Sequence, residues 1–155
     1  MRLVAMLAVL GLTGCSWFGF GSDDAQDQGA ASGGIAGLSV DQVAAPIAAD
    51  GTVLVDSLAE VVPEPALRGV IVRATSIAST QGYHDATLVA ANRGTPDANG
   101  IVTFAFRATP PLGNQAVGPA RSRVLTAAVF VHDSDLAEIR GFRVVSRGNT
   151  VNLRR

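Results

Sequence analysis

Two histidines are each followed by an aspartate, and these pairs are the residues best suited to metal or acid–base chemistry. They are His84-Asp85 and His132-Asp133. Imidazole and carboxylate groups bind zinc and non-haem metals, but a closed site needs four ligands, or three and a water. Neighbouring residues of a strand point to opposite faces, so each pair offers one ligand to each face. A hydrolase or metal-binding enzyme using His84 or His132 is therefore the alternative reading, and no nucleophile, phosphate-loop or dinucleotide motif accompanies it.

Arginine is the second chemically informative residue, because it supplies all 12 basic side chains. Several arginines alternate with apolar residues on expected strands and should therefore point outward. Guanidinium groups bind carboxylates and phosphates through paired hydrogen bonds. We expect a surface for an anionic partner, or for the chain's own acidic segment, formed by Arg73, Arg107, Arg121, Arg123, Arg143 and Arg147. Scattered solvated arginines are the alternative.

Charge is divided unevenly along the 155 residues. Residues 16–64 hold eight carboxylates and no arginine, whereas residues 65–155 hold 11 arginines and five carboxylates. The formal net charge is only −1, so the composition suggests no nucleic-acid partner. A single cysteine excludes an intramolecular disulfide framework. No cofactor is expected, and the length fits one domain with a tail.

The N-terminus has the pattern of a targeting signal. Arg2 precedes an apolar run from Leu3 to Thr13, which is typical of a secretory signal peptide and too short for a membrane-spanning helix. The run ends in Leu12-Thr13-Gly14-Cys15, which resembles the lipobox of bacterial lipoproteins. The resemblance covers residues 1–16. It implies removal of residues 1–14 as a signal peptide and acylation of Cys15.

The lipoprotein resemblance implies a lipid-anchored protein of the cell envelope that faces the periplasm. Each buried methylene contributes about 0.8 kcal/mol, and stable anchoring needs two or more acyl chains. In enteric bacteria, a residue other than aspartate after the cysteine favours the outer membrane over the inner one, and here that residue is Ser16. Aromatic side chains prefer the headgroup region. We therefore expect membrane contact, or alternatively docking on the folded domain, by Trp17, Phe18 and Phe20.

The composition separates a linker from a folded domain. Residues 15–50 are rich in Gly, Ala, Ser and Asp, which predicts a flexible acidic linker. Residues 51–155 contain β-branched and alternating segments, clearest where Val102, Phe104 and Phe106 alternate with Thr103, Ala105 and Arg107.

These segments favour an all-β fold, an antiparallel, immunoglobulin-like β-sandwich of six or seven strands, with a small β-barrel as the alternative. The apolar segment from Val124 to Val131 is expected to be a central strand. Pro96–Gly100 should form a turn, Asp135–Glu138 a helical turn and Val151–Leu153 a short edge strand.

The chain is also similar to small uncharacterised lipoproteins of alphaproteobacteria. The similarity lies in turns such as Gln81-Gly82-Tyr83 and in Phe106-Arg107 before Pro110-Pro111. It implies no activity. The leading prediction is a non-enzymatic, lipid-anchored envelope protein whose β-sandwich binds a partner or takes part in assembly.

Overall fold

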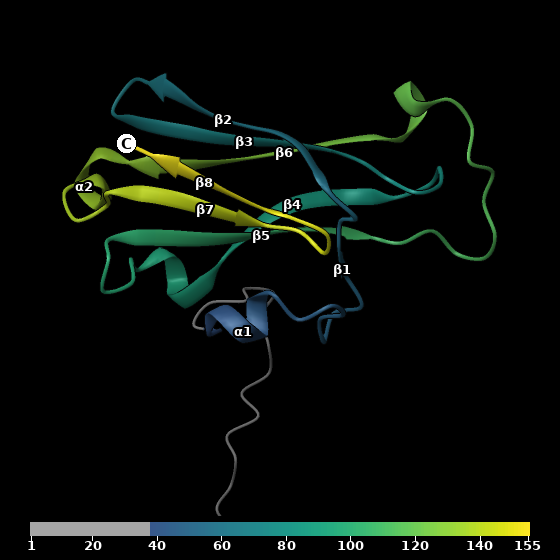
Figure 1. Ribbon diagram of the computed structural model, residues 1–155, viewed down its shortest axis with the longest axis horizontal. Coiled ribbons are helices and arrows are strands. Elements are labelled where there is room, and N and C mark those ends of the chain that lie inside the picture. Colours follow the sequence, from purple (N-terminus) through teal and green to yellow (C-terminus); the bar gives the residue numbers. More distant parts are fainter. Residues whose placement is uncertain (1–37) are drawn as a thin grey trace, which may run out of the picture. The chain divides into compact units, whose positions relative to one another are not determined.

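Residues 38–155 form a β-sandwich of two facing sheets in the computed structural model, which describes only this part of the chain (Figure 1). The larger sheet contains β1 (Val53–Leu54), β4 (His84–Ala90), β5 (Ile101–Thr109), β7 (Gly141–Val145) and β8 (Thr150–Arg154). The smaller sheet contains β2 (Leu58–Ala66), β3 (Gly69–Ile77) and β6 (Val124–His132). The remaining elements are α1 (Val40–Val43), α2 (Asp133–Leu136) and the 3-10 turns η1 (Ala91–Gly94) and η2 (Ala120–Arg123).

Strand β5 is the centre of the larger sheet. Its first half pairs in parallel with β7, its second half pairs antiparallel with β1, and β4 pairs antiparallel along its other edge. Strand β8 follows β7, as the expected short edge strand. In the smaller sheet, β3 lies between β2 and β6. The predicted all-β sandwich is therefore confirmed and the barrel alternative is wrong, although the described residues hold eight strands and one parallel pair.

The alternation in β5 sorts its side chains between two environments. Val102, Phe104 and Phe106 are each at most 2% exposed and face the smaller sheet. The Phe104 and Phe142 ring centroids lie 6.2 Å apart in the same core. Full burial of each such side chain stabilises the fold by roughly 1.5–3 kcal/mol.

The opposite face of β5 is covered by residues 38–52, which we call the N-terminal strap. Figure 1 shows its helix α1 on the side of β5 away from β2 and β3. Ser39 caps α1 in a reciprocal capping box with Gln42, and Val43 packs at 2% exposure against Ala105. The structure therefore corrects the expected linker boundary at residue 50, because the last part of that segment is docked on the sheet.

Asn149, in the β7–β8 hairpin, connects the two sheets. Its Oδ1 accepts from the Leu58 backbone N–H at 2.8 Å, and its Nδ2 donates to the Leu58 carbonyl at 3.1 Å. The Ser146 hydroxyl donates to the same Asn149 Oδ1 at 2.6 Å. The Asn149 side-chain amide thus pairs with both backbone groups of Leu58, as the backbone of a neighbouring strand would.

Three local expectations meet different outcomes. Strand β6 is an edge strand rather than a central one, because it pairs with β3 alone. Its outward residues, such as Val124 and Phe130, remain almost half exposed. The helical turn α2 begins two residues earlier than expected. The turn before β5 is confirmed, since Asp97 Oδ1 accepts the backbone N–H groups of Asn99 and Ile101 at 2.8 and 3.0 Å. Helices in residues 38–155 have four residues each, far short of a bilayer span.

Candidate functional site

Arg107 is the largest fully buried side chain of the described residues, at 1% exposure. Its Nε donates to Thr52 Oγ1 at 2.9 Å and its Nη2 to the Thr52 carbonyl at 2.6 Å. Its Nη1 donates to the carbonyls of Val43 and Ala45 at 2.9 and 2.7 Å. The expectation that Arg107 is exposed to a partner is therefore wrong. The side chain points away from the intersheet core, as alternation predicts, but the N-terminal strap covers it.

The charge of Arg107 is balanced through a hydroxyl rather than by direct ion pairing. Thr52 Oγ1 accepts from Arg107 and donates to Asp50 Oδ1 at 2.8 Å. Hydrogen bonds from the backbone and hydroxyl of Thr52 hold the pKa of Asp50 below its usual value. Burial lowers the pKa of the Arg107 guanidinium, and the Asp50 charge opposes that shift. The arrangement makes Arg107 a structural clamp for the strap.

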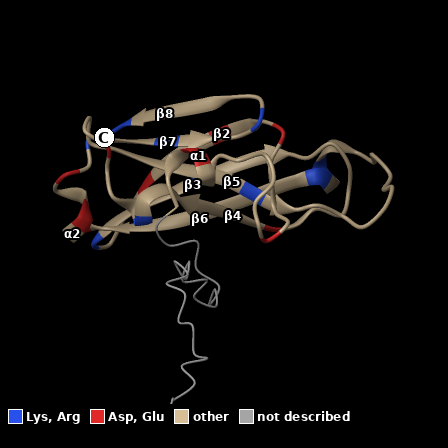
Figure 2. Cartoon of the chain, turned by 90° about the horizontal axis from the view of Figure 1, so that it is seen from below, with Lys and Arg blue, Asp and Glu red and all other residues tan. Residues whose placement is uncertain are grey.

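The exposed arginines do not gather on one face. Arg73 pairs with Glu64 at 2.7 Å on the outer side of the smaller sheet. Arg143 donates to Asn152 at 3.0 Å in the larger sheet. Figure 2 shows blue arginine segments on both sheets, interspersed with red acidic segments. The structure therefore does not bring Arg73 and Arg143 together on one surface for an anionic partner.

The remaining three arginines of that set lie near the end of the sandwich where β6 begins. Arg147 pairs with Asp56 at 3.1 Å, and Arg123 donates to the backbone carbonyl of Ala78. Arg121 is exposed in η2. The guanidinium groups of Arg147 and Arg123 therefore already bind groups of this chain and stabilise its loops.

The two histidines lie at opposite ends of the sandwich. His84 starts β4 opposite Thr109, whereas His132 ends β6 immediately before α2 (Figure 1). His84 Nε2 lies 3.7 Å from the neighbouring Asp85 carboxylate, and both side chains are exposed. The His132 ring packs edge-on against Phe130 at 5.4 Å. Residues 38–155 contain no cluster of three or more potential metal ligands.

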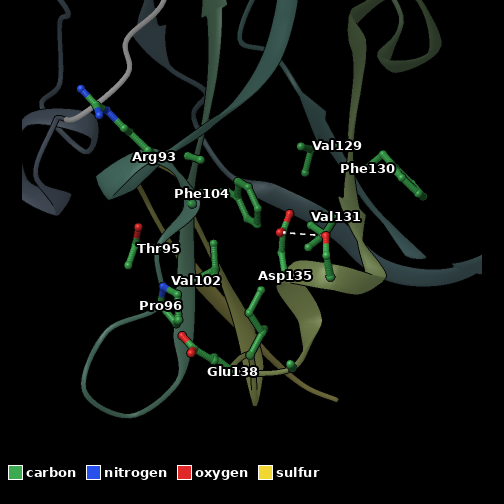
Figure 3. A pocket seen from close by; sticks show the side chains of 15 residues that line it. Arg93, Thr95, Pro96, Val102, Phe104, Val129, Phe130, Val131, Asp135 and Glu138 are labelled. Atoms are coloured by element: carbon green, nitrogen blue, oxygen red, sulfur yellow. Dashed lines mark hydrogen bonds between the residues drawn. The ribbon is translucent and has the colours of Figure 1, made fainter. Parts of the chain in front are cut away.

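A cavity of about 590 Å³ opens between β4 and β6, beside α2. Val102 and Phe104 of β5 lie at its base, and Val131 of β6 forms one wall (Figure 3). Asp135 and Glu138 stand at its mouth. Sequence reasoning missed this cavity, because it arises where two distant strand edges separate. The three-residue spacing of the two carboxylates beside an apolar strand was its only local signal.

The residues expected to reach the membrane lie outside the described part of the chain. These are Cys15, Trp17, Phe18 and Phe20, together with the signal peptide and most of the linker. Comparisons with protein-family models, curated proteins and solved structures give no match for this chain. The fold defines an all-β sandwich with an intersheet cavity.

Proposed function

We propose that this chain is a lipid-anchored protein of the cell envelope, facing the periplasm, whose β-sandwich is a non-enzymatic binding or assembly module. The proposal of a lipid anchor rests on the sequence Leu12-Thr13-Gly14-Cys15, which follows a short apolar run. Ser16 after the cysteine favours the outer membrane. Trp17, Phe18 and Phe20 would add contact with the headgroup region.

The intersheet cavity supports the binding role. Small-molecule sites are concave and mostly apolar, with a few polar groups, and occupy roughly 300–1,000 Å³. The cavity beside α2 lies within this range of volume, and both apolar and polar groups line it. An anionic envelope component or acidic protein would meet arginines on two separate sheets. The cavity is therefore a better supported binding site than the arginine set.

The enzyme alternative has less support in the described residues. His84 and His132 are separated by the length of the sandwich, so they cannot act on one substrate atom together. Neither histidine is among the residues that line the cavity between β4 and β6. We therefore carry only the non-enzymatic proposal forward.

The anchor is tested by replacing the residue that would carry the lipid. The full chain and its Cys15→Ala variant are expressed in a bacterial host, labelled with radioactive palmitate and fractionated. We expect label and membrane association for the unchanged chain, and loss of both for the variant. Ser16→Ala serves as the matched control and should keep both. Unchanged processing and membrane association after Cys15→Ala would contradict the lipid anchor.

A further inference from the structure

The cavity beside α2 combines an apolar interior with a polar opening. Val102 and Phe104 lie at its base but are almost fully covered by their neighbours, and the partly exposed apolar side chains of its lining are Ala90, Pro96 and Val129. The Phe130 ring contributes no surface to the cavity, because it points to the outer face of the smaller sheet (Figure 3). An aliphatic group of a few carbons would cover Ala90, Pro96 and Val129, and its removal from water favours binding.

The charged groups that face the opening are carboxylates. Asp135 and Glu138 are exposed and lie three residues apart, and the Ser134 hydroxyl donates to Asp135 at 3.1 Å. The described residues place neither carboxylate in an ion pair. Arg93 belongs to the lining, but Figure 3 shows its guanidinium directed away from the cavity. The opening therefore presents negative charge above an apolar base.

The rim opposite the carboxylates is held in a fixed, strained shape. Asn92 and Arg93 of η1 adopt left-handed backbone angles, with φ of 49° and 58°. Such angles are uncommon for residues other than glycine, although asparagine adopts them more readily than arginine, and contacts around η1 hold them in place. One such contact joins the Asn92 N–H to the Leu38 carbonyl of the strap at 2.7 Å. Binding of a ligand at this rim therefore costs little conformational entropy, because the backbone of η1 is already held in place.

From these observations we propose that the cavity binds a small amphiphilic amine. Its ammonium group lies between Asp135 and Glu138, and its aliphatic part covers the partly exposed side chains of Ala90, Pro96 and Val129. Charge complementarity selects a cation over an anion or a neutral alcohol of the same length. This inference deepens the proposed binding module, and it rests on that function only for its biological setting.

The test compares three ligands of equal chain length, n-octylamine, n-octanol and octanoate. Binding is measured by NMR titration of the mature chain, residues 15–155, with Cys15→Ser to prevent lipidation. We expect saturable shifts at residues lining the cavity, with the amine bound most tightly and octanoate least. Because exposed ion pairs contribute ~0–1 kcal/mol, removing each carboxylate should weaken amine binding by up to about five-fold.

The variants separate charge from general damage. Asp135→Asn combined with Glu138→Gln should remove the preference for amine while octanol binding stays unchanged. Asp133→Asn, in the same helical turn but outside the lining, is the matched control and should change nothing. Thr95→Trp at the exposed rim should reduce binding of all three ligands.

Three results would overturn the assignment. They are no saturable amine binding, equal affinity for the three ligands, or equal losses in the double variant and the Asp133→Asn control. None of them bears on the lipid anchor, because the titrated chain carries no lipid. Conversely, failure of the Cys15→Ala test would leave amine binding to the cavity intact.

Discussion

Replacing Arg107 by methionine should detach the N-terminal strap while leaving the two sheets paired. The change keeps an unbranched side chain but removes the donors to the carbonyls of Val43, Ala45 and Thr52. A buried carbonyl left without a donor costs roughly 1–3 kcal/mol. Only the bond to Val43 is fully buried, and water can reach the other two once the clamp is gone. Losing a buried charge also returns part of its desolvation cost. We therefore expect a loss of about 2–4 kcal/mol in strap docking.

Hydrogen exchange measures this loss locally, and urea unfolding measures it globally. The Val43 and Ala48 amides donate to Ser39 and Thr52 carbonyls within the strap, both at 2.9 Å. Their exchange should accelerate by roughly 30- to 1,000-fold, because each 1.4 kcal/mol corresponds to a factor of ten. Amides between β3 and β6 should exchange as in the unchanged chain.

The matched control is Arg73→Met, which removes an exposed arginine whose partner is Glu64. Exposed ion pairs contribute ~0–1 kcal/mol, so this variant should unfold close to the unchanged chain. The reasoning about the clamp fails if Arg107→Met lies within about 0.5 kcal/mol of the control and the strap amides remain protected.

Three further outcomes are expected. Asn149→Ala removes both hydrogen bonds to the Leu58 backbone and should lower the free energy of unfolding in urea by about 1–3 kcal/mol; a value near zero would mean that water replaces the amide. Gly69→Ala would place a Cβ only 2.2 Å from the Val131 carbonyl oxygen, so the backbone must shift and thermal unfolding should show a loss of roughly 1–3 kcal/mol. Backbone hydrogen bonds from Ile101 and Asn99 lower the pKa of Asp97 from 3.8, so its stabilising contribution is present above pH 3.8 and lost as the pH falls through the lowered value. Asp97→Asn should consequently destabilise the chain more at pH 6 than at pH 2 in urea titrations, and an equal effect at both would contradict this.

The alternation of β5 predicted the direction of its side chains but not their surroundings. Val102, Phe104 and Phe106 face the core as expected, and Arg107 faces the other way. Exposure of Arg107 depends on what lies over that face. The covering strap has the composition of a linker, because its few apolar anchors, such as Val43, are diluted by alanine, glycine and aspartate. Composition averaged over a segment cannot reveal docking through a few apolar side chains and the hydrogen bonds of one buried arginine.

The position of β6 shows a second limit of pattern reasoning. Its residues are apolar on both faces, which is typical of a central strand. The outward residues Val124 and Phe130 are nevertheless about half exposed, since no further layer covers them. The cavity was not predictable for a related reason, because its walls come from strands separated by tens of residues and its volume depends on how their edges diverge.

The clamp also fixes where mechanical load enters the fold. Any pull along residues 1–37 reaches the described structure at Leu38, whose carbonyl is held by Asn92. The next attachment is the Val43 carbonyl on Arg107, a side chain of the central strand β5. Tension is therefore spread over a turn and a guanidinium group before it reaches the two-residue strand β1. Force applied through residues 1–37 would therefore break the contacts of the strap before it separates paired strands of either sheet.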